Sequence, residues 1–125
     1  VFLNGEARAH NVHAQPQINR EFNRGHMNKD DEITIRFDLP EPAIRIKCDV
    51  HPWEAAWIHV VEHPYFAVTG PDGRYVLGDL PPGDYEVTAW HERFIVHTLV
   101  SKVKVEAGRT ATLDFTFSVA PAKPR

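Results

Sequence analysis

Apolar and polar side chains alternate along several stretches of this chain, and this alternation constrains the fold more than any other sequence feature. The period of two holds in four segments, residues 32–37, 44–50, 85–90 and 112–118. Successive side chains of a strand point to opposite faces, so each segment predicts a half-buried strand of an antiparallel sheet. Helix signals are weak throughout. The sequence therefore predicts an all-β protein.

Turn sequences separate these strands. Residues 71–73 (Pro-Asp-Gly) combine a proline that presets the first corner with a glycine that accepts positive φ. Residues 80–84 form a second predicted turn, and residues 107–108 close a predicted hairpin between 103–105 and 110–117. Short strands joined by regular turns are typical of a β-sandwich or barrel.

A domain boundary is predicted near His63-Pro64, because residues with metal-binding chemistry precede it and strands with tight turns follow it. The expected parts are residues 1–63, residues 64–119 and a mobile tail, 120–125. A half of about 60 residues is marginal for a core of its own, so we expect the halves to pack together. Residues 14–30 are polar and unpatterned, which predicts a long loop or a loop with one helical turn.

Composition excludes several classes of protein. Lys and Arg number 14 against 17 Asp and Glu, a net charge of −3, and no basic run marks a nucleic-acid binder. No apolar run approaches the roughly 20 residues that a membrane helix needs. A single Cys excludes an internal disulfide framework. The 8 His, in contrast, make the chain rich in side chains that bind metals.

Two short stretches carry this metal chemistry. Cys48 and His51 lie three residues apart at the end of a predicted strand, and a thiolate and an imidazole on one loop can bind the same ion. His10 and His13 offer a further ligand, but they lie an odd number of residues apart and point to opposite faces of a strand, so only one can serve. Cys with two His is the ligand set of a blue-copper site. The alternative for Cys48 taken alone is a buried, inert thiol.

The order of these residues resembles the cupredoxin family, in particular its amicyanin- and plastocyanin-like members. The shared motifs are His-Asn-Val-His at residues 10–13 and Cys-Asp-Val-His-Pro-Trp at residues 48–53. The resemblance implies that His10, Cys48 and His51 bind copper, and that His51 is the exposed edge where electrons enter and leave.

The chain departs from the cupredoxin pattern at Glu54, which stands where that family has its axial Met. A carboxylate ligand is expected to bind Cu(II) more strongly than a thioether and to lower the reduction potential. Glu54 could instead turn to solvent and leave a three-coordinate or water-bound site. Met27 is the single Met and the one thioether available as a substitute.

A second resemblance covers residues 65–118. The sequences Phe-Ala-Val-Thr at 66–69, Asp-Gly-Arg-Tyr at 72–75 and Leu-Pro-Pro-Gly-Asp-Tyr at 80–85 resemble the transthyretin-like, carboxypeptidase regulatory-like β-sandwich, a non-catalytic module. Bacterial secreted proteins join the two patterns with earlier strands in front. The composite implies a cupredoxin-like Greek-key sandwich without its first strands, packed with the second sandwich. It also implies a periplasmic or extracellular location.

The functional expectation is a copper protein, not an enzyme, with a mononuclear type 1-like or red-type copper. It is expected to transfer single electrons to or from a c-type cytochrome or a membrane or extracellular complex. One alternative is an accessory subunit of an extracytoplasmic complex with a vestigial or structural copper or zinc site. Another is metal storage or delivery, because Cys, two His and Glu form an acceptable zinc set. A cysteine hydrolase is disfavoured, since Cys48 and His51 share one loop without an orienting Asn or an oxyanion turn.

Overall fold

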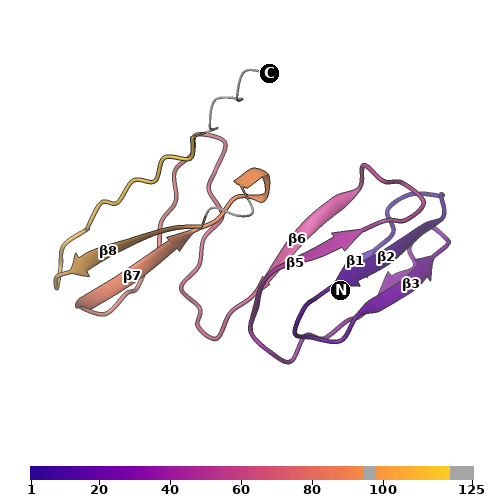
Figure 1. Ribbon diagram of the computed structural model, residues 1–125, viewed down its shortest axis with the longest axis horizontal. Coiled ribbons are helices and arrows are strands. Elements are labelled where there is room, and N and C mark those ends of the chain that lie inside the picture. The colour runs from indigo at the N-terminus through magenta and orange to yellow at the C-terminus, as the bar shows by residue number, and fades with distance from the viewer. Residues whose placement is uncertain (95–97, 119–125) are drawn as a thin grey trace, which may run out of the picture. The chain divides into compact units, whose positions relative to one another are not determined.

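The structure is a computed structural model and describes residues 1–94 and 98–118. Strands make up nearly all of its regular structure, which confirms the predicted all-β class (Figure 1). The elements are β1 (Phe2–Leu3), β2 (His10–Gln15), β3 (Phe22–His26), β4 (Glu32–Ile33), β5 (Glu41–Lys47), β6 (Ala55–Val60), β7 (Gly83–Ala89), the 3-10 helix η1 (Glu92–Phe94) and β8 (Leu99–Val105). No helix within the described residues has the length and apolar character to cross a membrane.

The chain divides into two compact units, Val1–Pro64 and Tyr65–Arg125. The first unit contains a four-stranded antiparallel sheet in the order β3-β2-β5-β6 and the small pair β1-β4 (Figure 1). The second unit contains the antiparallel pair β7-β8. The predicted mobile tail, residues 120–125, lies outside the described residues.

Alternation along β2 and β5 builds the core of the first unit. Val12 and Ala14 of β2 and Ile44 and Ile46 of β5 are buried together, and Ala14 lies directly opposite Ile46 in the register. Because the side-chain period of a strand is two, His10 shares the core face of β2. His13 lies on the opposite face, where it borders solvent.

The first unit corrects two expectations. Residues 14–30 are not a single loop, because they hold the end of β2 and the edge strand β3. The pattern of β3 is obscured by Arg24, which falls on the core side but lies over the Phe22 ring, 5.3 Å from its centre. Val50 does not continue the core face of β5: that strand ends at Lys47, and Val50 is 56% exposed in the following loop.

The predicted strand 32–37 forms a ladder only over Glu32–Ile33, which pairs with β1. Ile35 and Phe37 still pack against the core, so their alternation reports burial without a hydrogen-bonded neighbour.

In the second unit the predicted turn at residues 71–73 is confirmed. Gly73 has φ 76°, and its N–H donates to the carbonyl of Gly70 at 2.9 Å. The predicted strand 110–117 forms no ladder among the described residues. Leu113, Phe115 and Phe117 are half-buried, so an extended chain lying on an apolar surface produced the alternating pattern. The Tyr75 hydroxyl donates to the carbonyl of Leu113 at 2.8 Å and ties this segment down.

A buried carboxylate fixes the loop between β2 and β3. Glu41 begins β5 and accepts hydrogen bonds from the backbone N–H groups of Gln17 and Asn19 and from the Asn19 amide. Burial alone raises the pKa of a carboxyl, but these donors outweigh it and lower the pKa of Glu41 to about 2. The ionised carboxylate therefore stabilises the folded state.

We expect Glu41→Gln to destabilise the protein at neutral pH, by an amount that shrinks in acid. A carboxyl with a lowered folded-state pKa contributes stability above its ordinary pKa, and this contribution is lost as pH falls through the folded value, about 2. Urea unfolding midpoints between pH 7 and pH 2 measure the difference. Glu62→Gln, the same change at an exposed side chain, is the control. A difference that is constant with pH would contradict this account.

Candidate metal centre

Four side chains with metal-binding atoms meet at one end of the four-stranded sheet. They are His10, Cys48, His51 and Glu54, and their candidate ligand atoms all lie within 4.8 Å of one another. No other group of three or more His, Cys, Asp or Glu side chains with this geometry occurs in residues 1–94 and 98–118.

The distances define a compact cluster. Cys48 Sγ lies 4.0 Å from His10 Nδ1 and 3.7 Å from His51 Nδ1, and the two Nδ1 atoms are 3.1 Å apart. Glu54 places Oε2 2.9 Å from His10 Nδ1 and Oε1 3.7 Å from His51 Nδ1. One sulfur, two imidazole nitrogens and a carboxylate therefore point at a common centre.

Local structure explains why three of these residues converge. Cys48, His51 and Glu54 lie in the loop that joins β5 to β6, whose closing pair is Lys47 opposite Ala55. The N–H of Cys48 donates to the carbonyl of Glu54 at 3.2 Å, and the N–H of Glu54 donates to the carbonyl of His51 at 2.9 Å. His10 reaches them from the start of β2, on the core face of the sheet.

Burial differs across the cluster. Cys48 is 5% exposed, and the side chains of His10 and His51 are 13% and 18% exposed. The Glu54 side chain is 41% exposed. The Trp53 ring lies 5.3 Å from the His51 ring and is 78% exposed, so an aromatic side chain borders the cluster at the surface.

A reciprocal pair of hydrogen bonds joins the residues that directly follow His10 and Cys48. The Asn11 amide donates to Asp49 Oδ2 at 2.8 Å, and the Asp49 N–H donates to Asn11 Oδ1 at 2.6 Å. Asn11 Oδ1 also lies 3.4 Å from Cys48 Sγ. The pair fixes β2 against the loop between β5 and β6 (residues 48–54, the ligand loop). It thereby sets the separation of His10 and Cys48.

Asp49 is the centre of a larger network on the outer face of the sheet. Lys47 Nζ lies 2.7 Å from Oδ1, while the Asn23 amide donates to Oδ2 at 3.0 Å. His13 Nδ1 lies 2.9 Å from Oδ2, and its Nε2 lies 2.8 Å from Glu21. Lys47 first, and then the Asn11 amide, hold the pKa of Asp49 well below its ordinary value. The carboxylate therefore stays ionised behind the ligand loop.

The sequence reasoning missed Asn11 and Asp49 as parts of this site. Their positions were a signal. Asn11 directly follows His10 on a strand and so faces the side opposite to it, and Asp49 directly follows Cys48. Met27, the alternative thioether, is 59% exposed.

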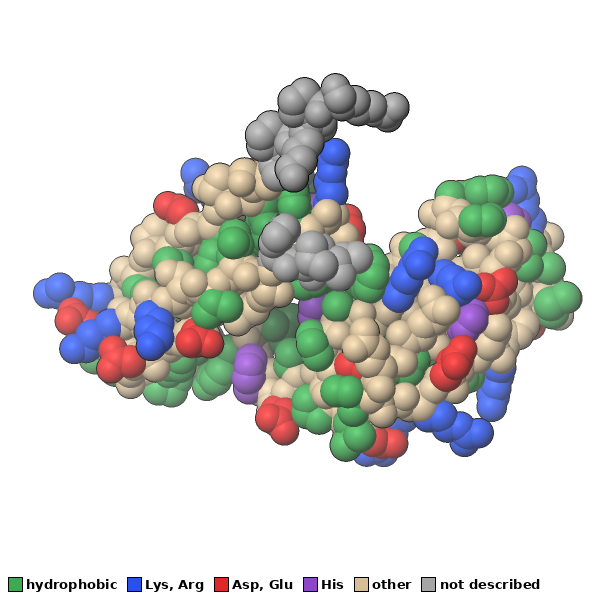
Figure 2. All heavy atoms as spheres, in the orientation of Figure 1, with side chains coloured by type: hydrophobic (Ala, Val, Ile, Leu, Met, Phe, Trp, Pro, Cys, Tyr) green, Lys and Arg blue, Asp and Glu red, His purple; other side chains and the backbone are tan. Residues whose placement is uncertain are grey.

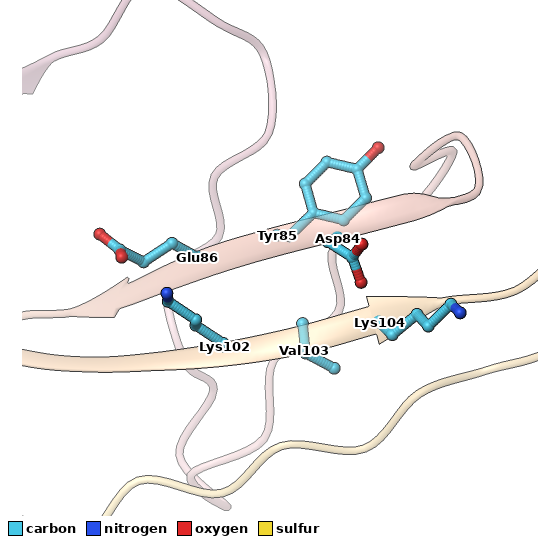
Figure 3. Close-up of a pocket in the computed structure, with 6 residues that line it drawn as sticks. All are labelled: Asp84, Tyr85, Glu86, Lys102, Val103 and Lys104. Carbon is cyan, nitrogen blue, oxygen red and sulfur yellow. The ribbon is translucent and has the colours of Figure 1, made fainter.

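A shallow concavity lined by residues of β7 and β8 in the second unit carries charged side chains, but it lacks the Cys and His donors of the cluster. Figure 3 shows Asp84 and Glu86 on β7 facing Lys102 and Lys104 on β8. The register sets Asp84 opposite Lys104 and Glu86 opposite Lys102, an arrangement that favours this strand pairing. Charges of both signs are interspersed on the visible face of the molecule (Figure 2).

The four donors fit two metals. Copper in electron-transfer sites takes two His and one Cys with a weaker further ligand. Zinc takes four ligands from Cys, His and carboxylates in a tetrahedral arrangement. The cluster supplies one thiolate from Cys48 and two imidazoles from His10 and His51, which either ion could use.

Comparison with protein families gives one match, to the carboxypeptidase regulatory-like domain over residues 51–118, more than half of the chain. The chain belongs to this family. Comparisons with curated proteins and with solved structures found no match. His51 and Glu54 lie inside the matched segment, whereas His10 and Cys48 precede it. The matched segment therefore begins inside the ligand loop and continues through the second compact unit.

We expect Asp49→Ala to weaken metal binding while the protein stays folded. Loss of a partner behind the ligands typically costs 10–100-fold in metal affinity. Competition between the protein and a chelator for Cu(II) or Zn(II) measures the affinity, and circular dichroism checks the fold. Asp38→Ala, at an exposed aspartate paired with Arg36, is the control. An unchanged affinity in Asp49→Ala would show that the network does not organise the ligands.

Proposed function

We propose that this protein is a mononuclear copper protein that transfers single electrons to or from an extracytoplasmic redox partner. The observation that carries the proposal is the convergence of Cys48 Sγ with the Nδ1 atoms of His10 and His51 within 4.0 Å. Thiolate and imidazole together form the donor set that suits a copper site of this kind. Bound there, a copper ion would supply reversible one-electron chemistry.

The surroundings of the cluster support this role. His10 begins β2, the other three residues lie in the loop between the paired strands β5 and β6, and the hydrogen bonds between Asn11 and Asp49 connect β2 to that loop. A rigid ligand set that changes little between oxidation states favours fast electron transfer. The cupredoxin-like arrangement of the first unit is part of this proposal.

The route for electrons would pass through His51. Its side chain is the outermost imidazole of the cluster and lies beside the exposed Trp53 ring. A partner that contacts this surface would come close to the ligand set without crossing the sheet. We propose a c-type cytochrome or another redox subunit of the periplasm or the extracellular space as that partner.

One observation favours an alternative, a structural copper or zinc site in a non-catalytic accessory subunit. Glu54 Oε2 lies 2.9 Å from His10 Nδ1, so the carboxylate is placed to complete a four-ligand set of the kind that zinc prefers. Such a site would hold β2 to the β5–β6 loop, and with zinc it would support no redox chemistry. Membership of the carboxypeptidase regulatory-like family is compatible with a structural site in an accessory subunit as well.

We expect one equivalent of Cu(II) to produce an intense visible absorption band that depends on Cys48. The band arises from charge transfer between a thiolate and copper, so Cys48→Ala abolishes it. His63→Ala, a histidine outside the cluster, keeps the band and serves as the control. A colourless protein that binds zinc tightly would overturn the redox role in favour of the structural one.

We expect Glu54→Met to raise the reduction potential of the copper-loaded protein. A carboxylate stabilises Cu(II) more than a thioether does, so its removal favours the reduced state. Protein-film voltammetry measures the shift. The change Glu62→Met, at an exposed site after β6, should leave the potential unchanged. If Glu54→Met also had no effect, Glu54 would not be a ligand.

A further inference from the structure

A concavity of about 510 Å³ lies against the metal-binding cluster, on the core face of the four-stranded sheet. Three members of the cluster border it, His10, Cys48 and Glu54, whereas His51 does not. Trp53, which borders the surface that we assign to the electron partner, also lines the concavity, so the two surfaces adjoin at this ring.

Most of the wall is apolar. Phe2 and Leu3 of β1, Val12 of β2 and Ile46 of β5 line it, together with Ala56 of β6. These side chains supply no metal donor. Two charged side chains also line the concavity, and both have partners: Glu6 lies 3.9 Å from Arg8, and Lys47 lies 2.7 Å from Asp49.

The polar side chains of the wall near β1 are already engaged. The Asn4 amide donates to the carbonyls of Arg8 and His26 at 2.8 and 3.1 Å, and its Oδ1 accepts from the N–H of Glu6. The His26 ring contacts the carbonyl of Asp31. These groups fix the wall near β1. The cluster adds His10, Cys48 and Glu54 to the same concavity, and Glu54 is the carboxylate among them.

Glu54 is also the cluster member that can move most readily. Its side chain is 41% exposed, against 13% for His10 and 18% for His51. Its carboxylate contacts His10 and His51, and among the described residues no hydrogen bond or ion pair joins it to the network around Asp49. A carboxylate held only from the ligand side can rotate towards solvent while Cys48 and the imidazoles stay in place.

We propose that the concavity is a binding site for a small monoanion that coordinates the metal in place of Glu54. Charge determines this class of ligand: a divalent ion with one thiolate and two neutral imidazoles carries one net positive charge, which the Glu54 carboxylate otherwise neutralises. A ligand that replaces the carboxylate in a partly apolar site must supply the same charge, because an uncompensated charge there is costly.

The inference rests on the proposed metal function, and azide is the probe that tests it. Azide is added to the Cu(II)-loaded protein while the Cys48-dependent absorption band and the electron paramagnetic resonance spectrum are recorded. We expect both signals to shift and to saturate as azide rises. In Glu54→Gln, which removes the competing carboxylate charge but keeps the side-chain size, we expect roughly tenfold tighter azide binding, a change of about 1.4 kcal/mol.

A second variant separates binding in the concavity from binding elsewhere on the metal. Ala56 is exposed on β6 and faces the concavity, so Ala56→Phe fills the space without changing a ligand. We expect azide binding to weaken at least about tenfold, with the absorption band of the azide-free protein unchanged. The matched control is Val61→Phe, at an exposed residue that does not line the concavity.

The outcomes distinguish the two proposals. A Cys48-dependent band that azide leaves unchanged would overturn the anion site and leave the copper function standing. Azide binding that Ala56→Phe does not weaken would also overturn it, since the anion would then reach the metal by another route. The absence of any Cys48-dependent band would overturn the proposed function, and the anion site with it.

Discussion

The hydrogen-bonded pair between Asn11 and Asp49 is the interaction on which the candidate site depends. Neither side chain belongs to the four-residue cluster, yet each follows one of its members directly, and together they connect the outer face of β2 to the loop after β5. The core residues of the same two strands fix the sheet from the other side. The candidate metal-binding cluster on one face and the polar network on the opposite face therefore share one pair of strands.

Sequence reasoning predicted the strands whose two faces differ most in polarity. β5 and β7 were anticipated because Ile44, Ile46, Tyr85 and Val87 alternate with charged or polar neighbours. β3 was not, because an edge strand with Arg24 on the core side shows no clean period. The separation of His10 from His13 followed from strand geometry alone. The hydrogen bonds between Asn11 and Asp49 could not be predicted in this way. They join residues 38 positions apart and depend on a strand pairing that the sequence does not specify.

Glu54 gives the cluster its unusual character. Its carboxylate contacts both imidazoles, but its exposure exceeds theirs and the network behind the loop does not hold it. Three cluster residues are thus constrained by the fold, and the fourth is constrained mainly by the other three. Under the proposed metal function, that difference would allow either a closed set of four ligands or a set with one exchangeable position.

The family match that starts at His51 has a consequence for how such a site is inherited. Two members of the cluster lie inside the matched segment and two lie before it, although all four belong to one compact unit. Recombination at the edge of the matched segment would transfer His51 and Glu54 to a new protein and leave His10 and Cys48 behind. The four-residue cluster is therefore complete only where both segments are joined in one chain.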